Sequence, residues 1–252
     1  MAEAAAPAPA LAETPLGALN RRLGARMVPF AGHALPIQFA EGIMAEHRWC
    51  RASAALFDVS HMGQIALRGA GADAALEALV PADIMGLPEG RQRYALLMNA
   101  AGGIDDDLMV ARLGGALHLV VNGAVRDADL ATIRAAMPAG VTVEARFDRA
   151  LIALQGPKAV EALARHAPAV ADMRFMDAAE VVVAGAPALV TRSGYTGEDG
   201  FEIALAPGDA GRVAEALLAE PEVRPAGLGA RDSLRLEAGL CLYGQDLDPA
   251  VS

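Results

Sequence analysis

The hydrophobic positions of this chain fall into short runs that glycine, proline and acidic turns interrupt, a pattern typical of strands with short helices between them. Strand-like runs occur at residues 27–32, 35–39 and 56–62. The pair Thr14 and Pro15 predicts the start of a helix, and a second helix is expected over residues 43–51. In the run 56–62, neither face of the expected strand is uniformly polar. We therefore expect other parts of the chain to cover both faces.

From residue 64 onward the pattern repeats. A strand at 65–69 with a helical pattern after it returns as a strand at 152–156 with a similar helix. The hairpin around Gly102 and Gly103 has a counterpart whose turn covers residues 193–200. Each hairpin leads to a helix, over 126–137 and 209–219. The repeat predicts an α+β fold of two similar halves, each an antiparallel sheet with helices, and a ligand cleft between them.

The order of the repeated segments predicts that the halves are interleaved along the chain. We expect residues 56–147 to join residues 226–252 in one half, and residues 11–55 to join residues 148–225 in the other. Residues 1–10 are rich in alanine and proline and are expected to form a disordered tail.

Composition narrows the classes of partner. With 252 residues, 54% of them hydrophobic, the chain can bury a sizeable core. A formal net charge of -10 repels phosphate backbones and anionic lipid, so nucleic acid and membrane are not expected partners. The two cysteines, Cys50 and Cys241, lie far apart without metal-ligand spacing, which indicates packing residues in a reducing compartment and no metal site. A cytoplasmic location is the prediction.

The most unusual polar stretch is the acidic run that follows Gly102 and Gly103. Asp105, Asp106 and Asp107 are adjacent like charges, which destabilise a fold unless they face water, a cation or a group that needs a base. In a strand, Asp105 and Asp107 share one face. A solvated acidic loop is the alternative interpretation.

Three segments together carry a family resemblance. Residues 193–202 (SGYTGEDGFE), 57–62 (FDVSHM) and 229–240 (GARDSLRLEAGL) resemble the aminomethyltransferase, or T-protein, of the glycine cleavage system, and the likeness extends from about residue 14 to residue 248. The resemblance implies a duplicated folate-binding fold. It also implies that the chain transfers an aminomethyl group from the lipoyl arm of H-protein to tetrahydrofolate, giving methylenetetrahydrofolate and ammonia.

The resemblance also implies a set of site residues. Asp107 matches the family's key acid, and Asp106 fits the same acidic pair. Glu202 matches a folate-binding glutamate, which could hold a pterin through two parallel hydrogen bonds, and Arg231 matches the arginine at that acidic end. The remaining implied cofactor contacts are Met62, Tyr94, Asn122 and Tyr195.

Each of these residues also has a structural interpretation. Glu202 could be a surface strand charge and Arg231 part of a structural ion pair near a helix start. Met62 could be core and Asn122 a strand cap, and His61 is interpreted as a buried core residue rather than a site residue.

Two other functions stay open on the sequence. Family members continue with a β-rich domain of about 100 residues, and we expect that C-terminal β-domain to be absent from this chain. The alternative is therefore a folate-binding module without transferase activity, or an inactive truncated form. A folate domain of a sarcosine or dimethylglycine oxidising enzyme is disfavoured, since no dinucleotide-binding glycine pattern precedes residue 60.

Overall fold

The computed structural model describes residues 10–251, and its strands form three sheets. The first is a five-stranded antiparallel sheet in the order β6-β7-β8-β5-β9. Its strands are β5 (Gly63–Arg68), β6 (Arg91–Met98), β7 (Ile104–Leu113), β8 (Ala116–Val121) and β9 (Thr142–Ala145). Helices α3 (Ala72–Glu77) and α4 (Arg126–Ala136) accompany it, and Leu76 and Ile133 bury their side chains in its core.

The second sheet has six strands in the order β11-β12-β13-β10-β4-β14, antiparallel except for the β14–β4 pair. Its strands are β4 (Ala54–Asp58), β10 (Ala150–Gln155), β11 (Ala178–Val183), β12 (Ala186–Thr191), β13 (Gly200–Leu205) and β14 (Val223–Pro225). Helices α5 (Ala159–Ala164) and α6 (Pro207–Leu218) and the short η1 (Pro168–Asp172) belong to this half.

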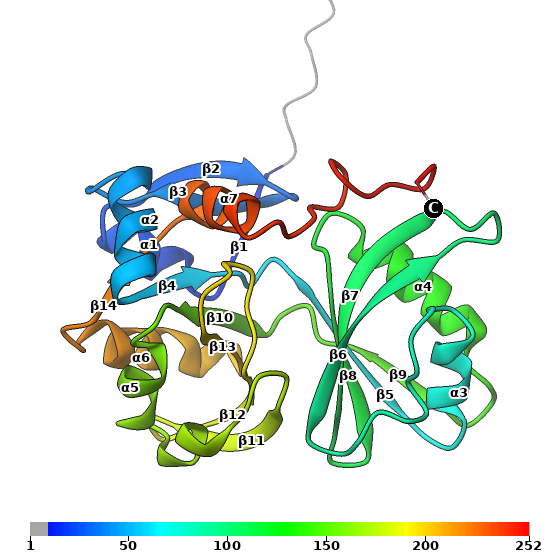
Figure 1. Cartoon of the computed structure of the whole chain (residues 1–252). Helices are drawn as coiled ribbons and strands as arrows, with labels where there is room; N and C mark the ends of the chain where they lie inside the picture. The colour runs from blue at the N-terminus through cyan, green and yellow to red at the C-terminus, as the bar shows by residue number, and fades with distance from the viewer. Residues whose placement is uncertain (1–9, 252) are drawn as a thin grey trace, which may run out of the picture.

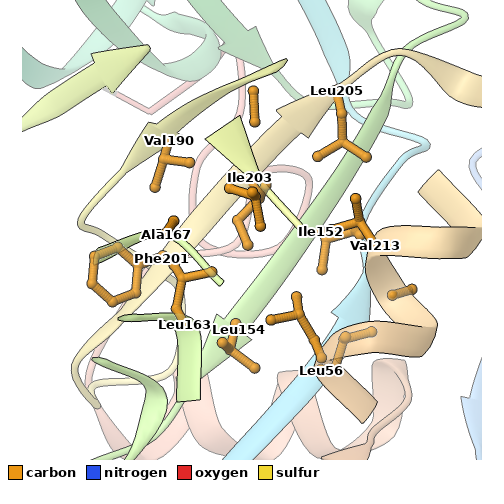
Figure 2. Close-up of a cluster of buried hydrophobic side chains, with 14 of the residues drawn as sticks. Leu56, Ile152, Leu154, Leu163, Ala167, Val190, Phe201, Ile203, Leu205 and Val213 are labelled. Carbon is orange, nitrogen blue, oxygen red and sulfur yellow. The ribbon is translucent and has the colours of Figure 1, made fainter. Parts of the chain in front are cut away.

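The core of this second half is built from alternate positions of its central strands. Figure 2 shows Ile152 and Leu154 of β10 beside Phe201 and Ile203 of β13, with Val213 of α6 close by, and all five are fully buried. Each fully buried apolar side chain of this size contributes roughly 1.5–3 kcal/mol. The alternation explains how neighbouring polar residues such as Glu202 are held on the opposite face of the same strand.

The N-terminal segment adds a third, small sheet in the order β1-β3-β2. Its strands are β1 (Ala12–Glu13), β2 (Arg26–Phe30) and β3 (His33–Gln38). Helix α1 (Gly17–Arg22) connects β1 to β2, and helix α2 (Ile43–Ala52) follows β3. The last helix, α7 (Leu228–Glu237), packs against α2 and β3. In Figure 1 the chain then crosses from α7 toward the tip of the β6–β7 hairpin, where Asp248 O accepts a hydrogen bond from Ile104 N at 3.2 Å.

The structure confirms the mixed α and β class, both hairpins and the strand–helix repeat, and it corrects several details. The strand expected over 56–62 ends at Asp58, because the Asp58 carboxylate accepts Ser60 N at 3.1 Å and the chain turns. Thr14 is not a helix cap, since its hydroxyl donates to Asp58 Oδ2 at 2.6 Å and the helix begins at Gly17. Cys50 is buried as expected, whereas Cys241 is exposed and is not a packing residue.

The interleaved division of the halves stays a prediction. Helix α7 packs against α2 and β3 of the N-terminal segment, and its Ala230 and Leu234 also share a buried cluster with Phe57 and Val59. Of the expected tail, residues 1–9 lie outside the described residues. Within residues 10–251 no helix is long and apolar enough to cross a membrane, and no three His, Cys, Asp or Glu side chains gather as metal ligands would.

Candidate active site

The β6–β7 hairpin positions the acidic run. Gly102 has φ +85°, a left-handed conformation that favours glycine, and the Asn99 side-chain oxygen accepts Ala101 N at 3.0 Å and Gly103 N at 2.9 Å. The three aspartates then enter β7 with alternating faces. Asp105 and Asp107 are half-buried on one face, as predicted, and Asp106 points to the buried face.

Asp107 is held by the amide of Asn122, which lies immediately after β8. Asn122 Nδ2 donates to Asp107 Oδ1 at 2.7 Å and to the Asp107 backbone oxygen at 3.2 Å. Burial raises the pKa of Asp107 above the ordinary aspartate value, while hydrogen bonds from Tyr94 and Asn122 oppose that rise. A carboxylate with a raised pKa and a fixed orientation is suited to accept a proton near neutral pH.

Two predicted aromatic residues lie beside this carboxylate. Tyr94 of β6 is 44% exposed, and burial together with the charge of Asp107 raises the pKa of its hydroxyl. Tyr195, in the turn after β12, is also within range of that charge, and burial raises its pKa to about 12. The Tyr195 hydroxyl donates to the backbone oxygen of Cys241. Asp107, Tyr94 and Tyr195 therefore meet in one place, although they come from different halves.

Hydrogen bonds from Gln155 hold the glycine-rich turn that carries Tyr195. Gln155 is the fully buried last residue of β10. Gln155 Nε2 donates to Ser193 O at 2.9 Å, and Gln155 Oε1 accepts the Thr196 hydroxyl at 2.9 Å. A Cβ atom at Gly194 would lie only 1.7 Å from Gln155 Oε1, so the close approach requires glycine there.

Arg231 and Glu202 form the charged end of the site. The Arg231 guanidinium lies over the Tyr195 ring, 4.8 Å from its centroid. Burial raises the pKa of Glu202, and the positive charge of Arg231 opposes that rise. Arg231 Nη1 is buried without a hydrogen-bond partner among residues 10–251, so it is a donor available to a ligand. Arg231 lies inside α7, not before the helix as the sequence suggested.

The remaining predicted residues occupy the surroundings. Met62 is partly buried and packs against a cluster that includes Phe57 and Ala230. His61 follows β4 and is buried with its ring edge against Phe30, and burial lowers its pKa to about 3, in keeping with its interpretation as a core residue. Both residues lie in a turn rather than in the expected strand.

A small cavity of about 50 Å³ lies between the five-stranded and six-stranded sheets. Its lining includes Met109 of β7, Gln92 of β6 and Glu202 of β13. Of the predicted site residues, Glu202 alone borders it. A larger hollow of about 810 Å³, near the start of β6 and η1, contains none of them.

Sequence reasoning missed one acidic group near the site. Asp129 of α4 is 2% exposed, and it lies close enough to Asp106 that the charge of Asp106, together with burial, raises its pKa. Acidic residues in the first turn of a helix usually face solvent and complement the helix dipole, so the sequence offered no signal that this one is buried. Tyr243, after α7, is also close enough to Asp106 and Asp105 that burial and their charges raise its pKa.

Comparison with known proteins places this chain in a family. The family model for the GCVT N-terminal domain matches residues 17–252. Among curated relatives, the mitochondrial aminomethyltransferase of Dictyostelium discoideum is 42% identical over 96% of this chain and 64% of its own length. The aminomethyltransferase of Rubrobacter xylanophilus is 47% identical over 94% of this chain and 64% of its own length. The chain thus spans a little under two thirds of these relatives.

Solved structures agree with the sequence comparisons. The glycine cleavage system aminomethyltransferase T from Bartonella henselae has a TM-score of 0.89 and 42% identity, and the match covers 95% of this chain and 66% of that one. A chain of heterotetrameric sarcosine oxidase from Corynebacterium sp. U-96 has a TM-score of 0.54 at 20% identity, over 88% of this chain and 95% of that one, which shows a shared fold alone. This chain belongs to the GCVT family, the family of the glycine cleavage aminomethyltransferases.

Proposed function

We propose that this chain transfers an aminomethyl group from the lipoyl arm of H-protein to tetrahydrofolate, giving methylenetetrahydrofolate and ammonia. The observation that carries the proposal is the position of Tyr195. This residue lies between Asp107 of one half and Arg231 of the other, so that the acid and the charged end form a single site. Membership of the family supports the reaction class.

The proposed reaction asks for a proton acceptor near the folate nitrogens. The aminomethyl carbon forms bonds to two folate nitrogens, its bonds to sulfur and to the amino nitrogen break, and the two folate N–H protons leave with ammonia and the free thiol. Asp107 accepts or orients one of these protons, because its raised pKa and its bond to Asn122 hold a carboxylate in one direction. General acid–base help of this kind contributes about 10²- to 10⁴-fold.

The charged end would recognise the pterin. A carboxylate can accept two parallel hydrogen bonds from the amino group and a ring N–H of a pterin, which is the role proposed for Glu202. Arg231 supplies a buried donor, Nη1, that has no hydrogen-bond partner within the described part of the chain. Tyr94, Tyr195, Met62 and Asn122 would line the remaining contact surface. We also propose that the chain acts in the cytoplasm.

Two measurements test the proposal. Calorimetry with tetrahydrofolate asks whether the chain binds folate, and formation of ammonia from H-protein loaded with the aminomethyl group asks whether it transfers. The expected result is folate-dependent ammonia release that Asp107→Asn reduces by about 10²- to 10⁴-fold. Folate binding without any ammonia release would favour the alternative, a folate-binding module without transferase activity. Absence of both would remove the function.

A further inference from the structure

Two aspartates are closed off from solvent behind the face that carries Asp107. Asp106 is 0% exposed and Asp129 is 2% exposed, and the two carboxyl groups are close enough that each influences the pKa of the other. Asp129 Oδ2 is buried without a hydrogen-bond partner among residues 10–251. Two ionised carboxylates have acceptors only and repel each other, so a buried pair at such close range requires one of the two to hold a proton.

The hydrogen bonds of Asn122 decide which aspartate is ionised. Asn122 N donates to Asp106 Oδ2 at 2.9 Å, and Asn122 Nδ2 donates to Asp106 Oδ1 at 2.8 Å. Both oxygens of Asp106 therefore act as acceptors, which suits a carboxylate anion. Burial and the negative charges nearby raise the pKa of Asp129 to about 9. At neutral pH the proton belongs to Asp129.

The same amide connects this buried pair to the proposed acid. Asn122 Nδ2 donates to Asp107 Oδ1 at 2.7 Å as well as to Asp106 Oδ1. An amide nitrogen has two N–H donors, and the two short bonds to the carboxylates use both, with the Asp107 backbone oxygen at 3.2 Å sharing one of them. The hydrogen bonds from Asn122 to Asp106 therefore fix the direction from which Asp107 receives its own hydrogen bond.

We propose that Asp106 is a positioning residue that acts on Asp107 through Asn122, with Asp129 as its proton-holding partner. The inference deepens the proposed function, because it rests on Asp107 as the reacting acid.

Other ionisable groups face the pair from neighbouring elements. Asp105 and Asp107 contribute negative charge from β7. Tyr243 and Asp248 approach from the segment after α7, and the charge of Asp248 is one of those that act on Tyr243. These surroundings carry negative charge, which disfavours loss of the proton from the pair to solvent. Asp106 therefore stays the acceptor for Asn122.

The test is the titration of the Asp107 side-chain carboxyl, followed by ¹³C NMR in the parent chain and in Asp106→Asn. An amide at position 106 offers one acceptor instead of two, so Asn122 loses its anchor and its bond to Asp107. We expect the Asp107 midpoint to rise by about one pH unit, the size of a lost charge-assisted hydrogen bond. If Asp106 acted only as a nearby negative charge, its removal would lower the midpoint. The sign separates the two explanations.

Asp105→Asn is the matched control, because it removes the same charge from β7 without touching Asn122. The Asp107 midpoint should fall or stay unchanged in this variant. Asn122→Ala should give the same rise as Asp106→Asn, and combining the two should add nothing. A fall in the Asp106→Asn midpoint would overturn the proposal.

The parent chain provides a test that does not depend on a variant folding. At pH 7 the spectrum should show Asp106 ionised and Asp129 protonated, and the reverse assignment, or two ionised carboxyls, would refute the inference. None of these titrations uses substrate. A chain that titrates as expected but transfers no aminomethyl group would count against the proposed function and leave the positioning role standing.

Discussion

Replacement of Asp107 by asparagine is the most direct test of how this site works. The amide has almost the same shape, and its oxygen can still accept from Asn122 Nδ2, which lies 2.7 Å from Oδ1 in the parent. What disappears is the ability to take a proton. Turnover should therefore fall by about 10²- to 10⁴-fold, with folate affinity changed only a few-fold.

The pH dependence sharpens this prediction. Burial raises the pKa of Asp107, so the parent should lose activity on the acid side at a pH above the ordinary aspartate value of about 3.9. This acid limb of the pH profile, the loss of activity at low pH, should be missing from the residual activity of Asp107→Asn. The folded state also favours the protonated form of this group, which lowers stability as pH rises through the folded pKa. A neutral amide removes this cost, so the variant should be at least as stable as the parent at pH 7.

The assay is ammonia release from loaded H-protein with tetrahydrofolate across a pH series, together with thermal unfolding of each variant. Asp105→Asn, on the same face of β7, is the control for loss of charge and should keep the acid limb. A drop in turnover smaller than about tenfold would reduce Asp107 to a role in positioning. A marked loss of stability would show that the site needs the charged form, contrary to the reasoning from burial.

Three further outcomes are expected. Glu202→Ala should weaken folate binding by roughly 1.5–3 kcal/mol in calorimetry, whereas the exposed Glu180→Ala should not, and equal affinities would remove Glu202 from the site. Asp129→Asn should stabilise the chain more at pH 8 than at pH 5, because the folded state keeps Asp129 protonated up to about pH 9 while the unfolded state loses that proton above its ordinary pKa, so the cost of folding grows with pH. Denaturant unfolding at both pH values measures this, and a flat difference would contradict it. Gly194→Ala should displace the turn and weaken folate binding, since its Cβ would overlap the buried glutamine beneath the turn, while Gly208→Ala in the open helix α6 should leave binding unchanged.

Local pattern was enough to determine the elements of this protein. Period-two alternation with glycine turns located both hairpins, and the strand–glycine–helix repeat predicted the α+β class with two similar halves. The alternation of β7 also determined that Asp105 and Asp107 share a face, because successive side chains of a strand point to opposite sides. These features depend on neighbours in the chain, so the sequence carries them.

Contacts between distant segments were decided only by the tertiary structure. No local signal indicated that α7 would pack on α2 and β3, or that Thr14 would bond to Asp58 instead of capping a helix. The acidic run shows the same division. Its position after the turn was evident from the sequence, but the pKa values of Asp106 and Asp107 depend on burial and on Asn122, 15 residues away from Asp107.

Asp129 shows most clearly what the sequence alone could not determine. In the sequence it is an ordinary acidic residue in the first turn of a helix, where solvent and the helix dipole would keep it ionised. In the fold, α4 places it against Asp106, and burial beside that charge raises its pKa to about 9. Propensity and spacing describe each residue with its own neighbours, whereas desolvation depends on everything that packs around it, which only the folded chain determines.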